Sequence, residues 1–121
     1  MDYIEEIGEP TFYIGNEMDT PGCVRAGLVG LLYASFSMTI TNAQAQGLKI
    51  LFEQLWREKT FDIQGECEGL RVYMRLIQGE PGDTDRDVYS IALIADHAEL
   101  TATFPFGQIL SLIDDINTFV R

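Results

Sequence analysis

The chain has 121 residues, of which 46% are hydrophobic, and its 19 acidic side chains against 8 basic ones give a formal net charge of −11. This length is typical of a single domain, residues 1–121, with enough apolar side chains for a packed core. The charge argues against direct binding to nucleic acid or to an anionic membrane, since phosphate binding needs clustered Lys and Arg. It favours a basic protein as partner, or solubility alone.

Two cysteines, Cys23 and Cys67, and one histidine exclude a disulfide framework and argue strongly against a Cys/His zinc site. The N-terminal "MDYIEEIGEP" lacks the basic and then apolar pattern of a signal peptide. The longest apolar stretch, "AGLVGLLYASF", is too short to span a bilayer. We therefore expect a cytoplasmic protein with reduced thiols, no membrane association and no cofactor.

The first strand is predicted in "PTFYIGN", where Phe12 and Ile14 share one face, and the turn-rich segment 15–22 ends it. From Val24 to Ile40 apolar residues recur at every second position, which indicates an extended chain and not a helix.

Gly27 and Gly30 are expected to mark a bend or bulge that divides residues 24–40 into two strands. Residues 28–33 are apolar at both alternating sets of positions, which predicts a central strand covered on both sides there.

The period changes at Thr41, where "TNAQ" is a capping box that pairs the Thr41 hydroxyl with the backbone of Gln44. Apolar residues then follow helical spacing to about residue 58, which predicts an amphipathic helix over 42–58. Lys49, Glu53 and Arg57 are spaced for charge pairs on its wet side. Phe52 and Trp56, four residues apart, are expected to lie in the core.

Four strands are predicted next, in "TFDIQ", "GLRVYMRLIQ", "VYSIALIA" and "AELTATF". "GECEG" (65–69) is expected to link the first two, and residues 96–97 to form a tight turn between the last two. A second amphipathic helix is predicted over 106–120, after Pro105. The chain is thus an expected two-layer α+β domain: an antiparallel sheet of about five to six strands with two helices on one face.

Metal and catalytic chemistry find little support in the sequence. Asp83, Asp85 and Asp87 have the D-x-D-x-D spacing of an EF-hand, but Val88 replaces its glycine and Ile94 its bidentate Glu. His97 is the sole histidine, and no serine-hydrolase or phosphate-binding motif occurs. We predict no catalytic residue, no metal ligand and no enzyme activity.

For the cysteines, we expect Cys23, at the head of the long strand, to be a buried apolar residue and Cys67 an incidental turn residue. A Cys–His dyad would need one of them beside His97 in space. Arg71, Tyr73 and Arg75 share the outward face of one strand, an arrangement that single-strand nucleic acid readers use. Among 19 acids, cross-strand ion pairs are the favoured interpretation of these arginines.

Acidic residues gather in the predicted turns and supply the candidate partner-binding set. In a meander, alternate turns lie at the same end of the sheet, so the turns at 64–69 and 95–98 should share one end and the loop at 79–87 the other. Such a surface would speed encounter with a basic partner, although solubility alone would also explain it. The largest cluster, in the loop at 79–87, is the first candidate: Glu80, Asp83, Asp85 and Asp87, to which the other end could add Glu66, Glu68, Asp96 and Glu99.

The architecture of "GLLYASFSMTI", "TNAQAQGLKILFEQLW", "LRVYMRLI" and "GQILSLIDDINTFV", together with the acidity, is similar to that of small acidic immunity proteins of bacterial polymorphic toxin systems. These include the proteins paired with contact-dependent inhibition toxins and with WapI-type toxins. The resemblance implies a non-enzymatic inhibitor that binds a basic toxin, for example a nuclease. It carries no diagnostic motif and assigns no site residue.

Two other functions remain open from the sequence. An anti-defence protein of the phage type would use acidity to mimic nucleic acid, and a small ligand-binding domain would use a pocket between sheet and helices. The sequence also leaves the oligomeric state and the identity of the partner open.

Overall fold

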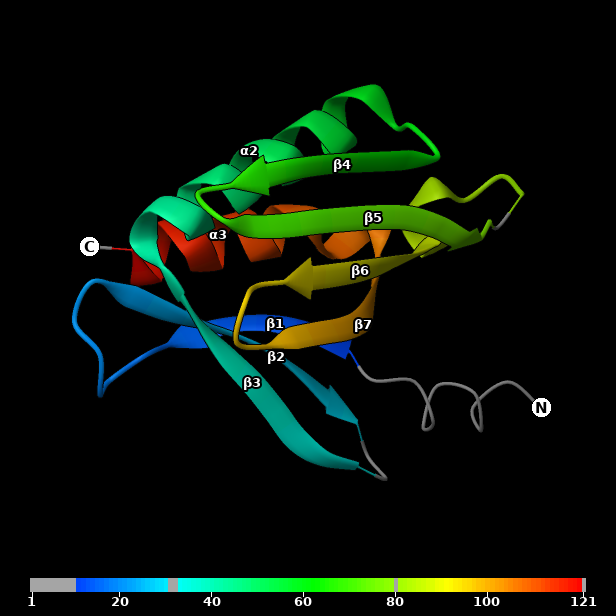
Figure 1. Cartoon of the computed structure of the whole chain (residues 1–121). Coiled ribbons are helices and arrows are strands. Elements are labelled where there is room, and N and C mark those ends of the chain that lie inside the picture. The colour runs from blue at the N-terminus through cyan, green and yellow to red at the C-terminus, as the bar shows by residue number, and fades with distance from the viewer. Residues whose placement is uncertain (1–10, 31–32, 80, 121) are drawn as a thin grey trace.

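A computed structural model describes residues 11–30, 33–79 and 81–120, and the side chains of these except at 33–35. Two short 3-10 helices, Thr84–Arg86 and Phe106–Gln108, accompany the main elements (Figure 1). Those elements are β1 Thr11–Asn16, β2 Cys23–Gly30, β3 Tyr33–Thr41, α2 Asn42–Glu58, β4 Asp62–Cys67, β5 Leu70–Gln78, β6 Val88–Ile94, β7 Glu99–Pro105 and α3 Ile109–Phe119.

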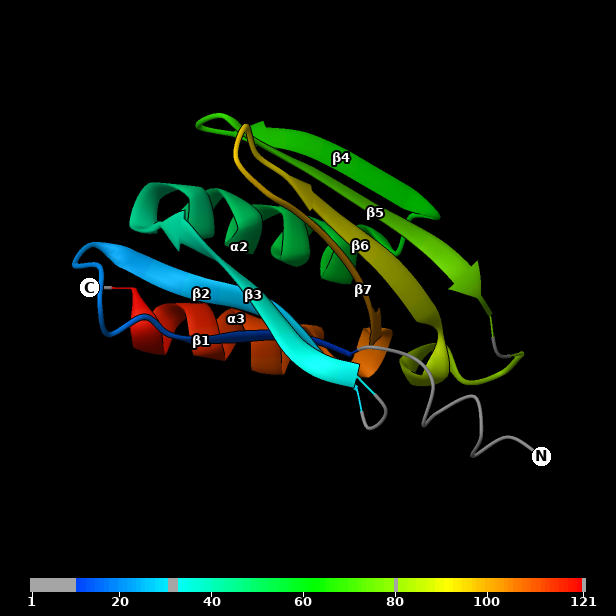
Figure 2. The same cartoon turned by 60° about the horizontal axis from the view of Figure 1, so that its bottom comes forward.

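The strands form one seven-stranded sheet in the order β3-β2-β1-β7-β6-β5-β4. The α+β class is confirmed, but the sheet is larger than the five to six strands predicted, and it is mixed because β1 pairs with β7 in parallel. Among the described residues that pairing is seen at Thr11 and Thr103, which are far apart in sequence and carry no turn signature. Figure 2 shows the consequence: two antiparallel wings, β1–β3 and β4–β7, that meet where β1 begins and diverge from there.

Both helices cover the same face of the sheet, and one hydrophobic core fills the space between the layers. The rings of Phe104 and of Phe52 from α2 pack edge to face, with centroids 5.6 Å apart. Trp56 stacks on Phe106 at 5.0 Å, which confirms that it belongs to the packing of the core. The strand side chains that point at the helices include Phe12, Ile14, Val24, Ala26, Met38, Ile40, Leu70, Val72, Met74, Ile91, Leu93, Leu100, Ala102 and Phe104.

The capping box at the start of α2 is confirmed. The Gln44 N–H donates to the Thr41 hydroxyl at 3.0 Å, and the Thr41 N–H donates to the Gln44 side chain at 2.9 Å. The charge pairs expected along the wet side of α2 are not formed. Lys49 instead donates to Asn117 of α3 at 3.1 Å, which ties the two helices together. The predicted second helix begins later than expected, because a 3-10 turn precedes α3.

Residues 24–40 are extended, as predicted, and the register between β2 and β3 shifts between Leu28 and Gly30. The prediction for Gly27 was wrong: it lies inside β2, under the ring of Tyr13. A Cβ at position 27 would lie only 2.6 Å from a ring carbon of Tyr13, so glycine there lets the Tyr13 ring lie close to the backbone and does not mark a bend. The prediction that residues 28–33 form a strand covered on both sides was also wrong at Val29, whose side chain is 46% exposed.

The second wing differs from the prediction at its first hairpin. Phe61, expected inside a strand, precedes β4 and is 78% exposed. The expected link at 65–69 is shorter, because β4 continues through Cys67. Glu68 and Gly69 alone make the turn, with φ values of 52° and 88°, as a type I′ hairpin requires. The turn at 96–97 is confirmed by the Ala95 N–H, which donates to the Ala98 carbonyl at 2.8 Å.

Candidate docking surface

The meander β4–β7 has two acidic ends, and the structure places them as predicted. The β4–β5 and β6–β7 turns lie at one end of the wing and the β5–β6 loop at the other (Figure 1). We call Glu66, Glu68, Asp96 and Glu99 the turn end, and Asp83, Asp85 and Asp87 the loop end. Glu80, which was predicted to belong to the same set, lies outside the described residues.

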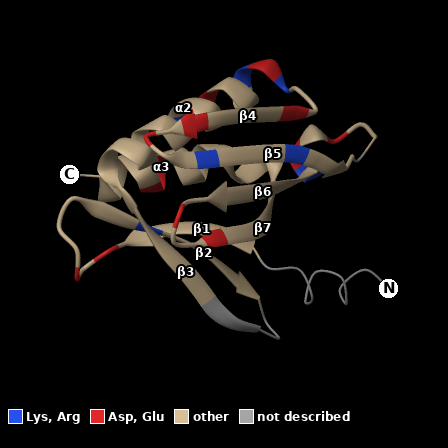
Figure 3. Ribbon diagram, in the orientation of Figure 1, with Lys and Arg blue, Asp and Glu red and all other residues tan. Residues whose placement is uncertain are grey.

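The turn end brings together carboxylates from two separate hairpins (Figure 3). Glu68 and Asp96 stand in the turns themselves, whereas Glu66 lies in β4 and Glu99 begins β7. All four residues are exposed. Within the part of the chain that the structure describes, none of their carboxylates forms an ion pair or accepts a side-chain hydrogen bond. These carboxylates are therefore available to an incoming cation.

Strand register places two of these carboxylates on one surface. Glu66 lies opposite Arg71, Arg71 opposite Ile94, and Ile94 opposite Glu99, in a row across β4, β5, β6 and β7. With neighbouring strands about 4.8 Å apart, the row spans roughly 14 Å. It runs over the sheet face that points away from the helices, which we call the outer face. Acidic side chains thus lie at both ends of this row, with a cation and an apolar residue between them.

The backbone under the turn end is supported by groups other than these carboxylates. The Gln44 side chain donates to the Glu68 carbonyl at 3.0 Å, which joins the first hairpin to α2. Cys67 packs on Gly47 of the same helix, where a Cβ would lie 2.7 Å from the Cys67 sulfur. Burial, followed by the nearby Glu66 charge, raises the pKa of the Cys67 thiol. The hairpin is thus fixed while its acidic side chains stay in solvent.

The loop end is built differently: Asp83 and Asp85 are exposed, as the turn-end residues are, but all three acidic residues take part in local contacts. Asp83 forms an ion pair with Arg86 at 3.8 Å across the 3-10 turn. Asp85 packs beside Gly107, within the second 3-10 helix. The Asp87 carbonyl accepts a hydrogen bond from the Phe106 N–H at 2.8 Å, and the Asp87 residue is half-buried.

Asp87 also acts on the neighbouring core. Burial, and after it the Asp87 charge, raises the pKa of Tyr89, whose hydroxyl donates to the Thr60 carbonyl at 2.9 Å. The loop end therefore closes the β5–β6 connection with the Asp83–Arg86 ion pair and with contacts of Asp85 and of the Asp87 backbone.

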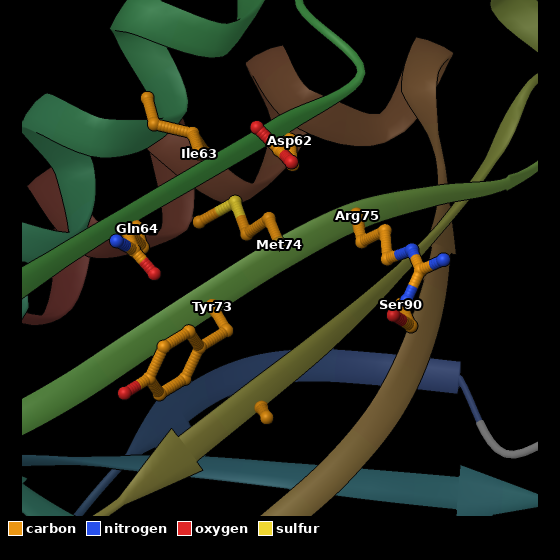
Figure 4. Close-up of a pocket in the computed structure, with 8 residues that line it drawn as sticks. Asp62, Ile63, Gln64, Tyr73, Met74, Arg75 and Ser90 are labelled. Carbon is orange, nitrogen blue, oxygen red and sulfur yellow. The ribbon is translucent and has the colours of Figure 1, made fainter.

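A shallow pocket of about 420 Å³ lies on the outer face beside the turn end (Figure 4). Ser90 and Ala92 of β6 form its low floor, and Tyr73 and Arg75 of β5 rise beside it. The Tyr73 side chain is 40% exposed, and no element of the described structure covers this face. The small residues of β6 had not been recognised from the sequence; their alternation in "YSIALI" was the available signal.

The arginines of this face are not paired as the sequence suggested. Arg71 lies opposite Glu66 and Arg75 opposite Asp62, as cross-strand pairing requires. Yet among the described residues no carboxylate approaches either guanidinium within ion-pair distance. The outer face therefore carries two available cations around Tyr73, beside the available carboxylates of the turn end.

In a third acidic segment, the β1–β2 turn, the Glu17 carboxylate is engaged within the protein, whereas Asp19 is exposed. The Glu17 carboxylate accepts hydrogen bonds from Thr39 at 2.8 Å, from Arg25 at 3.3 Å and from the Asp19 N–H at 3.2 Å. The bond from Thr39, then that from Asp19, and also Arg25 lower the pKa of Glu17. Its side chain is only 5% exposed, so it stabilises the turn against β3 and is not part of a docking surface.

Among the described residues, no three His, Cys, Asp or Glu side chains lie together so that they could hold a metal ion. The roles expected of the cysteines are reversed. Cys67 is the buried one, 7% exposed, because β4 extends through it, whereas Cys23 is half-buried.

None of the helices in the described ranges is long and apolar enough to cross a membrane. A scan of the sequence against models of known protein families finds no match, and a search of curated proteins finds none either.

Proposed function

We propose that the chain is a non-enzymatic binding protein that docks a basic partner protein and neutralises it, as an immunity protein does with its toxin. The docking surface consists of the turn end together with the outer face around Tyr73. The loop end, which was the first candidate from the sequence, contributes little to binding.

The observation that carries this proposal is the set of four exposed carboxylates at the turn end without an ion pair in the described structure. Unpaired surface charges cost little stability when they stay solvated, and they steer a partner of opposite charge toward the surface. Because they come from two hairpins of one rigid sheet, their spacing is fixed before binding. A partner with two basic clusters at matching separation gains affinity from this preorganisation.

Tyr73 supplies the uncharged centre that such an interface needs. Tyrosine and arginine are enriched among the residues that dominate protein–protein binding energies. Here Tyr73 stands between Arg71 and Arg75 over a floor of small side chains. The two guanidinium groups suit carboxylates of the partner, so the surface would recognise a mixed charge pattern and not merely a cation.

Binding to the protein encoded next to this chain's gene in its host tests the proposal. We expect isothermal titration calorimetry to show a one-to-one complex whose affinity falls as salt increases. If that protein is a toxin, its activity should stop at stoichiometric addition of the chain. A neighbour that is basic but does not bind even at low salt would contradict the proposal. Phage genes at that locus and binding to a nucleic-acid-binding host enzyme would favour a nucleic-acid mimic instead.

The role of Tyr73 has its own matched test. Tyr73→Ala should weaken the complex by about 2 kcal/mol, roughly thirty-fold, if the tyrosine is buried at the centre of the interface. Leu110→Ala is the control, because Leu110 is similarly exposed, at 49%, but lies on α3 in the opposite layer. Equal effects of the two substitutions would remove the outer face from the docking surface.

A further inference from the structure

The two edges of the sheet differ in how well they are protected against pairing with another strand. β4 has six residues, and Asp62 and Glu66 place carboxylates along it. β3, at the other edge, has nine residues without a charged side chain, a proline or a glycine. Proteins commonly block long edge strands with charges, prolines or bulges, because their unpaired backbone groups are a template for another chain. β3 lacks the first two devices along its length.

The hydrogen-bond alternation identifies which backbone groups of β3 are free. The Asn42 N–H donates to the Gly22 carbonyl at 2.9 Å, one step beyond the pair of Cys23 and Thr41. In an antiparallel ladder every second residue bonds to the neighbouring strand. Ile40, Met38 and Phe36 therefore bond to β2, and the N–H and C=O groups of Ser37 and Thr39 point away from the sheet.

Two observations agree with this assignment. The N–H of Thr41, which has the same parity as Ser37 and Thr39, donates to the Gln44 side chain and not to β2. Within the described ranges, no backbone group accepts or donates a hydrogen bond on the outer side of Ser37 or Thr39. Beside these groups Phe36 is 47% exposed although it shares a face with the buried Met38. The edge thus offers backbone hydrogen bonds and an apolar side chain together.

We propose that a second copy of this chain pairs with β3 in antiparallel fashion, so that two sheets join into one. A two-fold axis brings the same segment of both copies together. In a chain of net charge −11, acidic residues in that segment would repel each other, so a segment without charge is the favourable one for pairing. Among the described residues, the carboxylate that contacts β3 is that of Glu17, which accepts from Thr39 and pairs with Arg25 at 3.3 Å. Pairing at β4 would instead bring Asp62 and Glu66 against their own copies.

The dimer does not depend on the proposed function, and its seam lies at a different strand from the docking surface. β3 edges one wing, whereas the turn end and Tyr73 belong to the other (Figures 1 and 2). The complex would then hold two partner molecules for each dimer. In it, Phe36 would be covered by the facing β3, near its Met38, since both point to the helix side of the sheet.

Sedimentation velocity across roughly a hundred-fold range of concentration tests the proposal. We expect the mass to rise from 13.6 kDa to twice that value for the unmodified chain. Ser37→Pro should remain monomeric, because it removes an N–H that the protomer does not use but the dimer needs. A chain that stays monomeric throughout, or a Ser37→Pro dimer of unchanged affinity, would overturn the proposal.

Gln64→Pro at the other edge is the matched control. The Leu76 N–H donates to the Phe61 carbonyl at 2.7 Å, so alternation gives Gln64 an outward N–H as well. This variant should dimerise like the unmodified chain, and its loss of dimerisation would point to β4 as the interface. Ser37→Lys keeps the backbone donor but adds charge near the axis, and should weaken the dimer at least about ten-fold. Circular dichroism verifies that each variant folds. If Ser37→Pro does not fold, Ser37→Lys decides the question, and its unchanged dimerisation would overturn the proposal.

Discussion

The two ends of the β4–β7 meander are both acidic in sequence but differ in structure. At the loop end, Asp83 pairs with Arg86, Asp85 packs beside Gly107, and Asp87 is half-buried. At the turn end the carboxylates are unpaired among the described residues, and the backbone is fixed by Cys67 on Gly47 and by Gln44 on the Glu68 carbonyl. An acidic side chain is available for binding only where other groups determine the local conformation.

The packing of Cys67 on Gly47 gives the largest expected effect on stability. A Cβ at position 47 would lie 2.7 Å from the Cys67 sulfur and 2.8 Å from its Cβ, so α2 or β4 must shift. Gly47→Ala should lower the free energy of unfolding by about 1–3 kcal/mol, although alanine favours an exposed helix by about 1 kcal/mol. Urea unfolding measures the change. Gln46→Ala, its exposed neighbour, should change stability by less than about 0.5 kcal/mol. A Gly47→Ala variant as stable as that control would show that the turn end is not fixed by this contact.

The loop end should lose stability when a methyl group is added at Gly107, where Asp85 packs. A Cβ at position 107 would lie 3.2 Å from the Asp85 Cβ and 3.3 Å from the Asp85 carbonyl oxygen. We expect Gly107→Ala to cost about 1 kcal/mol, because the 3-10 turn at Thr84–Arg86 must move. Gly79→Ala is the control, since the nearest atom to its Cβ would be an Asp87 oxygen at 3.9 Å. Thermal melts in which both variants match the unmodified chain would mean that the loop end is loose.

Glu17 shows what a fully engaged carboxylate does, and its effect depends on pH. The pKa of Glu17 is lowered below 4.5, first by its hydrogen bond from Thr39. A lowered folded-state pKa stabilises the fold above the ordinary pKa, and that contribution is lost as the pH falls through the lowered value. Glu17→Gln should therefore be less stable than the unmodified chain at neutral pH, and the difference should shrink in acid. Asp19→Asn is the control. Denaturation curves whose difference for Glu17→Gln does not change with pH would contradict this assignment.

The smallest stability effects are expected for exposed carboxylates. Asp96→Asn at the turn end should leave the free energy of unfolding unchanged within about 0.5 kcal/mol, because Asp96 is exposed and unpaired in the described structure. Asp83→Asn breaks an exposed ion pair with Arg86 and should cost no more than about 0.5 kcal/mol. Calorimetric melting curves test both. A marked loss for Asp96→Asn would reveal a structural use of the turn end.

Local patterns in the sequence were sufficient for most of the architecture. The capping box at Thr41 and Gln44 fixed the start of α2, and the alternation over residues 24–40 gave two strands. Patterns of this kind act between near neighbours in the chain. The parallel pairing of Thr11 with Thr103 joins segments from opposite ends of the sequence, and no residue near either position indicates it.

The docking surface was predictable in outline and not in detail. Because the turns of a meander alternate between its two ends, Glu68 and Asp96 could be predicted to lie at the same end of the wing. It did not show that Asp83 would pair with Arg86 or that Asp85 would pack on Gly107, since both depend on tertiary contacts. The hairpin that holds Cys67 was misjudged because the turn requires positive φ only at Glu68 and Gly69, so β4 is longer than its glycines suggested.

The central claim, that the turn end and not the loop end meets the partner, is tested by two variants that change the net charge equally. One carries Glu68→Lys and Asp96→Lys, the other Asp83→Lys and Asp85→Lys. Titration of each with the basic protein encoded beside the gene, at several salt concentrations, gives the dissociation constant and its salt dependence. We expect the turn-end pair to weaken binding at least about ten-fold and to flatten the salt dependence, and the loop-end pair to change affinity no more than about two-fold. Equal weakening by both pairs would show that only net charge matters, and stronger weakening by the loop-end pair would place the interface at the opposite end of the wing.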